Sequence, residues 1–169
     1  IKKIFDSKMR LEKQIVWGKV SENNYSKLKK IINYTYEIES ITPSRIEEDF
    51  YSDENFIEIK IVSLFNYLGD KISETKIKFE KDNNEDHIEN DVEDNKEDDE
   101  KNISEKIIET KQWDYDEENR LIKYQWENEK ISSMTKYLYE EGFDNPNEKY
   151  FENNILIREK KYKDNNYYI

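Results

Sequence analysis

The sequence predicts a mainly β fold: an antiparallel meander of β-hairpin repeats that is interrupted by one long acidic insertion. The first observation is a short motif that recurs five times in 169 residues, and internal repetition of this kind decides architecture before any single residue does. The second is the aromatic content. Hydrophobic residues make up only 34% of the chain and charged residues 40%, which on their own would suggest disorder. The 13 Tyr, 7 Phe and 3 Trp argue against disorder, because aromatic residues bury large areas and favour strands.

Each copy of the motif has an aromatic residue, usually an Asn four positions later, and then an apolar pair. We interpret it as a turn: the aromatic residue closes one strand, polar residues turn the chain, and the apolar pair opens the next strand. The Asn tolerates the left-handed conformation that tight turns often need. The copies begin at Phe5, Tyr51, Tyr115, Tyr150 and Tyr162. The predicted turn residues are Asn55, Asn119, Asn154 and Asn166, and the copy at Phe5 has Met9 in this place.

The segments after the turns favour strands. Residues 55–65 alternate, with Ile57, Ile59 and Ile61 on one face. Residues 71–80, 120–127 and 130–140 are also predicted to be extended, and a turn at Asn128 and Glu129 separates the last two. Three units close in a similar way, at the aromatic residues Tyr36, Phe79 and Tyr139.

Short helices remain an open alternative in two places. Tyr25, Leu28, Ile31 and Ile32 fall at helical spacing, and residues 104–112 could form a short helix before the third unit.

The acidity of the chain is local. Between Asp82 and Glu100 the chain has eleven acidic residues and one basic residue, Lys96. Such a self-repelling stretch is expected to be disordered. We therefore divide the chain into hairpin repeats at 1–80, an acidic low-complexity insertion at 81–104, and further repeats at 105–169. Because the first residue is Ile and the fifth motif copy stops at Ile169, we expect a segment of a larger repeat protein, with the rest of the array as a neighbour.

The third unit contains Tyr115-Asp116, then Asn119-Arg120-Leu121, then Tyr137-Leu-Tyr139-Glu140. This pattern resembles the YD (RHS-type) repeats of large bacterial surface and toxin-delivery proteins, and the related MORN-variant hairpin repeats. Asn119 stands where those repeats have Gly, and Glu140 where they have Asp. The resemblance implies a β-array that acts as a shell, stalk or binding surface without catalytic residues, and it favours a cell-surface or envelope location.

The residue types for most familiar catalytic and metal sites are missing. The chain has no Cys, which excludes thiol catalysis and Cys-based metal sites. Its one His, His87, lies in the acidic stretch, so Ser-His-Asp triads and His-based metal centres are also excluded. Residues 82–93 partly match an EF-hand calcium loop but lack its required Gly. We therefore predict no enzyme, no catalytic residue, no metal and no cofactor.

A non-enzymatic structural or binding role, with a protein or glycan partner, is the function that we expect. One alternative is a carbohydrate-binding module or glycosidase, because Trp113 and Tyr115 share a strand face, as do Tyr124 and Trp126, and aromatic rows can stack on sugar rings. Cross-strand packing explains the same rows. Another alternative is a docking domain whose acidic stretch attracts a basic partner. Without a basic patch we expect no nucleic acid, and no apolar run approaches the ~20 residues of a membrane span.

Overall fold

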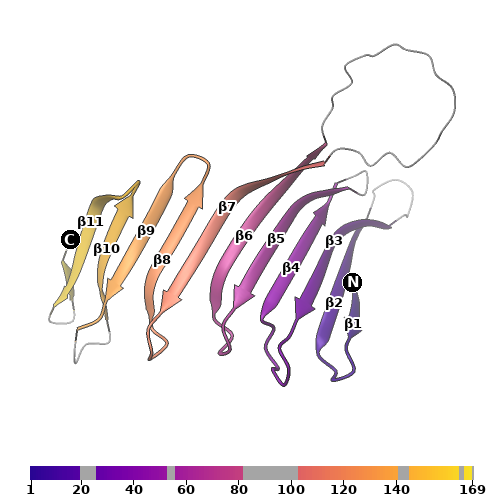
Figure 1. The fold of residues 1–169 in the computed structure, drawn as a ribbon, viewed down its shortest axis with the longest axis horizontal. Helices are drawn as coiled ribbons and strands as arrows, with labels where there is room; N and C mark the ends of the chain where they lie inside the picture. The colour runs from indigo at the N-terminus through magenta and orange to yellow at the C-terminus, as the bar shows by residue number, and fades with distance from the viewer. Residues whose placement is uncertain (20–25, 53–55, 82–102, 141–144, 164–165, 169) are drawn as a thin grey trace, which may run out of the picture.

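The computed structural model describes residues 1–19, 26–52, 56–81, 103–140, 145–163 and 166–168. Every regular element within these ranges is a β-strand, and the strands form one twelve-stranded sheet (Figure 1). The strands are β1 (Lys2–Phe5), β2 (Leu11–Lys19), β3 (Ser26–Thr35), β4 (Arg45–Tyr51), β5 (Ile57–Phe65), β6 (Lys71–Lys81), β7 (Ile103–Tyr115), β8 (Leu121–Asn128), β9 (Ser132–Leu138), β10 (Asn147–Glu152), β11 (Ile155–Lys163) and β12 (Asn166–Tyr168).

The sheet is an antiparallel meander in which each strand pairs with the next one along the chain, in the order β1 to β12. This confirms the predicted fold class. Strands β6 and β7 pair directly, from Ser73 opposite Gln112 to Lys81 opposite Ile103. The two regions of predicted repeats, on either side of the acidic stretch, therefore belong to one continuous sheet.

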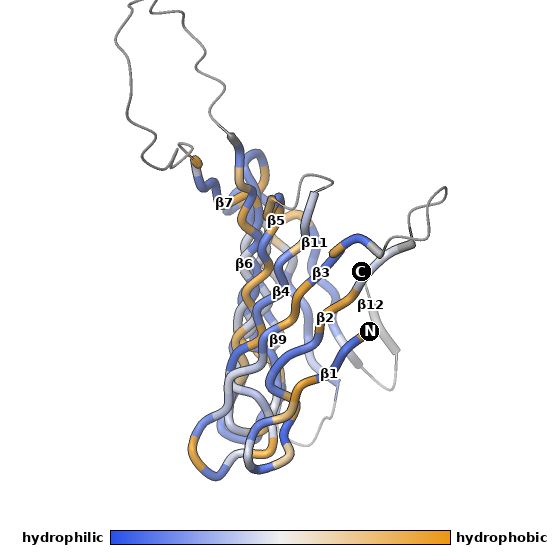
Figure 2. The backbone as a smooth tube through the Cα atoms, turned by 90° about the vertical axis from the view of Figure 1, so that its right-hand side faces the viewer, coloured by the Kyte–Doolittle hydropathy of each residue, from blue (hydrophilic) through white to orange (hydrophobic). Residues whose placement is uncertain are grey.

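The described residues form a single layer, as the edge-on view in Figure 2 shows. Ile32, at 8% exposure, is the one buried hydrophobic residue among them. The other buried residues are polar: Asp49, Ser63 and Ser133, at 7–8% exposure. Since no second layer covers either face of this part of the chain, the fold depends on backbone hydrogen bonds and on side-chain pairs between neighbouring strands.

The two faces of the sheet differ in composition. Directly paired residues project to the same face and successive residues alternate, so the pairing register assigns each side chain to a face. One face, which we call the aromatic face, holds Tyr34, Phe50, Trp113, Tyr124, Trp126, Tyr137 and Tyr150. The opposite face holds a row of directly paired lysines, Lys123, Lys136 and Lys149, which ends at Asp114 on one side and Glu159 on the other.

The motif copies mark hairpins, but not all of one kind. Phe5, Tyr51 and Tyr115 each end a strand, as expected, and the next strand begins six residues later. Tyr150 instead lies inside β10, and the turn consists of Asn153 and Asn154 alone, with φ of 48° and 66°. Positive φ at both central residues is the signature of a type I′ turn, which matches the twist of the two flanking strands. Tyr162 likewise lies inside β11.

The helical alternatives are wrong, because both segments are strands. Residues 26–35 form β3 and residues 103–115 form β7. In each strand the pairing skips one residue, Lys29 in β3 and Ile108 in β7. A bulge of this kind interrupts the two-residue alternation, so the apolar residues on either side acquire a spacing that imitates a helix.

Candidate functional site

The candidate site lies along one edge of the sheet, where successive turns stand side by side. We call this the turn edge; it includes residues 6–10, 36–44, 66–70 and 116–120 and lies at the bottom of Figure 1. Neighbouring turns contact one another directly. The Arg10 guanidinium donates to the Ser40 carbonyl at 2.8 Å, and Lys8 forms an ion pair with Glu39 at 3.2 Å.

Three turns of the turn edge share one backbone design. In each, the first residue donates its N–H to the carbonyl of the fifth residue at 2.9–3.0 Å, and the fourth residue donates back to the first at 3.0 Å. The fourth residue has positive φ: 61° at Met9, 92° at Gly69 and 61° at Asn119. Asn119 therefore has the positive φ that its predicted turn role requires, and so does Asn154, at 66°.

The first residue of these three turns is always Asp or Asn, because its side-chain oxygen closes the turn. Oδ1 of Asp6 accepts the backbone N–H groups of Lys8 and Arg10, both at 2.9 Å. Oδ1 of Asn66 accepts the corresponding N–H groups of Leu68 and Asp70, at 3.0 and 2.9 Å. Asp and Asn are favoured in turns because they can form such bonds with the backbone just ahead of them.

Two of the turns extend into a three-residue cluster that we call the Asp–Arg–Tyr module. Its members are Asp6, Arg10 and Tyr36 in one case and Asp116, Arg120 and Tyr139 in the other. In both, the Arg Nε lies 2.7 Å from the Asp carboxylate, and the guanidinium stands 4.5 Å from the centre of the Tyr ring. The Tyr hydroxyl donates to the carbonyl of the residue after the Arg, Leu11 at 3.0 Å or Leu121 at 3.2 Å. Each module thus ties a turn to the end of a neighbouring strand.

The module also lowers the pKa of its carboxyl group. Desolvation raises the pKa of Asp116, but the backbone N–H and the guanidinium of Arg120 outweigh it, so that the pKa falls below its ordinary value. The pKa of Asp6 is lowered in the same way, against desolvation and chiefly by Arg10.

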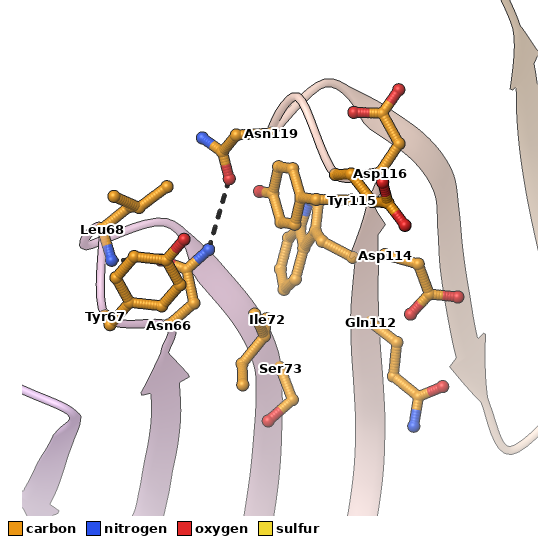
Figure 3. Close-up of a pocket in the computed structure, with 12 residues that line it drawn as sticks. Asn66, Tyr67, Leu68, Ile72, Ser73, Gln112, Asp114, Tyr115, Asp116 and Asn119 are labelled. Carbon is orange, nitrogen blue, oxygen red and sulfur yellow. Dashed lines mark hydrogen bonds between the residues drawn. The ribbon is translucent and has the colours of Figure 1, made fainter.

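The third turn departs from the module because Asp70 occupies the position of Arg10 and Arg120. Tyr115 still donates its hydroxyl to the Lys71 carbonyl, at 3.1 Å. Burial and the nearby Asp70 carboxylate both raise the pKa of Tyr115. On its other side, Asp70 accepts a hydrogen bond from the Asn119 amide at 2.8 Å. Figure 3 shows the neighbouring bond, which Asn66 donates to Asn119 at 3.5 Å. Tyr115 takes the closing position that the sequence suggested for Phe79. Phe79 lies near the other end of β6, opposite Glu105 of β7.

A groove of about 600 Å³ opens between turn 66–70 and turn 116–120 (Figure 3). Tyr67 stands at its side with 83% of its surface exposed. Amides, carboxylates, aromatic rings and aliphatic side chains line the groove together: Asn66, Tyr67, Leu68, Ile72, Ser73, Gln112, Trp113, Asp114, Tyr115, Asp116, Glu117 and Asn119.

Only two of the four residues predicted to stack on a ligand line the groove. Trp113 and Tyr115 line the groove, whereas Tyr124 and Trp126 do not. Trp113 is paired directly with Tyr124 across β7 and β8, with ring centroids 5.4 Å apart and planes tilted by 40°. All four rings are half-buried within the sheet surface, and burial raises the pKa of Tyr124.

Charged side chains on the aromatic face are bound to one another. Glu74 lies 2.5 Å from Lys71 and 2.9 Å from Lys111, which also reaches Glu109 at 2.6 Å. Burial raises the pKa of Glu74, but the two ammonium groups outweigh it and bring the pKa below its ordinary value. Glu109 and Glu74 together raise the pKa of Lys111. These ion pairs join β6 to β7.

Sequence reasoning predicted strands on both sides of residues 66–70 but missed that the motif recurs there, beginning at Phe65, and with it the most exposed aromatic side chain of the groove, Tyr67. The signal was present, since Gly69 stands four residues after Phe65, where the other copies have Asn or Met. Gly reaches positive φ more easily than Asn does. A motif that allowed Gly at this step would have included this hairpin.

Several predictions concern residues outside the described ranges. These are the turn role of Asn55, the EF-hand match at 82–93 and the acidic docking segment, and His87 also lies outside these ranges. Asn166 is described only as the first residue of β12. Among the described residues, no group of three or more His, Asp or Glu side chains is placed to hold a metal ion, and none forms a helix long and apolar enough to cross a membrane.

Comparison with family models, with curated proteins and with solved structures finds no match to this chain.

Proposed function

We propose that this chain is a non-enzymatic β-hairpin repeat segment with a structural or binding role. The observation that carries the proposal is the repeated Asp–Arg–Tyr module at the turn edge of a one-layer sheet. Each of the two modules links its hairpin to a neighbouring strand without a core, and hydrogen bonds within the turn hold its shape. Such a sheet offers two broad faces and a rigid edge, which suits a spacer or a binding surface.

The charge arrangement supports the same proposal. Ionic side chains of the described strands pair mainly across the sheet, as in Lys30–Glu48 at 2.5 Å, Lys123–Asp114 at 3.1 Å and Lys149–Glu159 at 3.5 Å. An enzyme of the acid–base type gathers titratable groups around a reacting centre and shifts their pKa values toward its working pH. Here the shifted carboxylates have lowered pKa values and support strands or turns.

Small-angle X-ray scattering tests the structural part of this proposal. We expect a plate with a thickness of about 10 Å, the depth of one β-layer. A compact particle with equal dimensions would contradict it.

Cross-linking tests the binding part, and the chain is well suited to it because it has no Cys. Arg158 lies on the aromatic face and Lys136 on the opposite face, and both are exposed. Arg158→Cys and Lys136→Cys, each labelled with a photo-cross-linker, probe one face at a time in an extract of the native source. A binding role predicts a discrete product from one face. A purely structural role predicts none from either.

A carbohydrate-binding module is the second candidate, and the groove favours it. Exposed Tyr67 beside carboxylates and amides is a combination that can stack on a sugar ring and bind its hydroxyl groups. A glycan array with the intact protein and with Tyr67→Ala tests this. Binding that is lost in Tyr67→Ala, but kept in Trp126→Leu outside the groove, would support the candidate, and an array without signal would exclude it.

A further inference from the structure

The four most exposed large apolar side chains of the described residues all stand on the turn edge. They are Ile38, Ile41, Tyr67 and Met9, at 90%, 88%, 83% and 79% exposure. Leu68, next to Tyr67, is 52% exposed. We call these five residues the tip row. They come from three consecutive turns, β1–β2, β3–β4 and β5–β6, and Figure 2 shows hydrophobic segments among the lowest turns. The next turn of this edge has Glu117 and Glu118 at its tip instead.

The backbone requirements of the turns do not explain why the residues of the tip row are apolar. Turns favour Gly, Asn, Asp, Ser and Pro, each for a backbone reason, and Ile has none of these reasons. Met9 is a stronger exception, because its φ of 61° is a conformation that costs a residue with a Cβ atom more than it costs Gly. Its counterparts are Gly69 and Asn119. Met9 therefore occupies an unfavourable backbone position while exposing its side chain to water, and a contact outside the chain would account for both.

The tips are held in fixed positions relative to one another. Arg10 donates to the Glu37 and Ser40 carbonyls, and this places turn 36–44 against turn 6–10. Phe65 donates its N–H to the Ser44 carbonyl at 2.9 Å, and Gly69 lies against the methyl group of Thr42. A ligand of the tip row thus meets an apolar edge that needs little further ordering.

The shape of the tip row indicates whether a protein or a lipid surface fits it. Six strands at normal spacing span about 25 Å, and the edge is only one layer deep. A stable protein interface buries about 800 Å² on each partner as a patch, and a single line of side chains does not provide that. A lipid surface requires no matching shape, and apolar side chains enter it to a depth of about 5–10 Å. Tyr is also favoured at the boundary between headgroups and hydrocarbon.

Charge indicates which lipid surface fits. The basic residues of the first turn are neutralised by neighbours, Lys8 by Glu39 at 3.2 Å and Arg10 by Asp6 at 2.7 Å. Glu37 and Asp70 add negative charge to the same three turns. The tip row therefore has no basic surplus to attract anionic headgroups.

We propose that the tip row inserts into the surface of a bilayer with neutral, zwitterionic headgroups and attaches the sheet to it by its turn edge. This goes beyond the proposed repeat function, which is tested by the shape of the sheet and by cross-linking from its faces. Failure of membrane attachment leaves those two results unaffected.

The test is sedimentation of the intact protein with phosphatidylcholine vesicles, with and without phosphatidylserine. We expect binding to phosphatidylcholine alone that does not weaken with salt. Ile38→Ser with Ile41→Ser should reduce the partition coefficient by about tenfold or more, because two inserted side chains are lost. The control is Ile155→Ser with Ile157→Ser, which removes two apolar side chains, 65% and 58% exposed, outside the turn edge.

Met9→Asn adds a second, independent readout. It should weaken vesicle binding while raising thermal stability, since Asn accepts positive φ more readily. A general loss of folding cannot produce that combination. The proposal is overturned if the vesicles do not bind the protein, if binding requires phosphatidylserine, or if the tip-row and control variants bind alike. It is also overturned if Ile38→Ser with Ile41→Ser converts a dimer into a monomer in sedimentation velocity, which would assign the row to a second copy of the chain.

Discussion

The guanidinium of Arg120 lies over the ring of Tyr139 at 4.5 Å, although strands β8 and β9 separate the two residues along the chain. Arg10 and Tyr36 repeat this arrangement at the same distance. In a one-layer sheet such contacts stabilise the fold in place of a core, because they hold the turn of one hairpin against the strand of the next. The stability of this protein should therefore respond to single changes in the modules.

The first prediction concerns the Tyr hydroxyl. Tyr139→Phe removes the hydrogen bond to the Leu121 carbonyl but keeps the ring under Arg120, and should lower the free energy of unfolding by about 1 kcal/mol. Urea denaturation measures this. Tyr67→Phe, at a ring that is 83% exposed, is the matched control. Equal effects of the two substitutions would contradict the module.

The second prediction concerns positive φ in the turns. Asn119→Val should destabilise the protein by about 1 kcal/mol or more, because a β-branched residue resists this conformation. Met9→Gly should change the thermal midpoint in the opposite direction, since a Cβ atom is removed from the same backbone position. Met9→Leu, which keeps both the Cβ atom and the apolar character, is the control and should change little. A lower midpoint in Met9→Gly would show that the Met side chain stabilises the fold itself.

Local signals in the sequence were sufficient for the architecture. The alternation of Ile57, Ile59 and Ile61 predicts a strand where β5 lies, and the Tyr115–Leu121 motif predicts the turn between β7 and β8. In a meander each strand pairs with its sequence neighbour, so correct hairpins imply the whole sheet order. That is why local reasoning sufficed for the fold class.

Contacts between hairpins could not be predicted from such local sequence signals. The sequence indicates Phe79 as a closing aromatic residue by its likeness to Tyr139, but Phe79 lies far along β6 from the turn edge, and Tyr115 takes the role. Which aromatic residue reaches a turn depends on strand lengths and on bulges such as Ile108, and neither has a clear sequence signal. The tip row was missed for a related reason, because Ile38 and Ile41 look like ordinary apolar residues until their turn is placed at an edge.

The third prediction rebuilds a module where the chain lacks one. Asn66→Asp together with Asp70→Arg gives the third turn the residues of the other two, and brings a guanidinium toward Tyr115 in place of a carboxylate. We expect a gain of about 0.5 kcal/mol, typical of an exposed cation–π contact. Thermal unfolding measures the gain. Asp70→Arg alone, without the Asp partner, should gain less, and a loss in the double variant would show that the Asn119–Asp70 hydrogen bond matters more than the module.

The fourth prediction is a loss of stability in acid. The folded pKa values of Asp6, Asp116 and Glu74 lie below their ordinary values of 3.8, 3.8 and 4.5. A group with a depressed folded pKa stabilises the fold above its unfolded pKa, and this contribution disappears as the pH falls through the folded pKa. The thermal midpoint should therefore hold from neutral pH to just above the ordinary values and fall below them.

The matched variant for the acid experiment is Asp6→Asn with Asp116→Asn, because Asn66 shows that Asn closes the same turn. This variant loses both ion pairs but keeps the turn bonds. It should start from a lower midpoint at pH 7 and lose less than the wild type between about pH 4 and pH 2. Parallel curves for the two proteins would mean that other carboxylates cause the acid loss.

The fifth prediction separates packing from ligand stacking at the pair Trp113 and Tyr124, whose ring centroids are 5.4 Å apart. A double-mutant cycle with Trp113→Leu and Tyr124→Leu should give a coupling of about 0.5–1.5 kcal/mol in the free energy of unfolding, the range of aromatic pairs. A coupling near zero would mean that the rings do not support each other and are free for a ligand. With normal coupling, one face of each ring is already engaged within the sheet, and a sugar would have to bind through Tyr67. The cycle therefore decides which aromatic residues a glycan-binding experiment should vary.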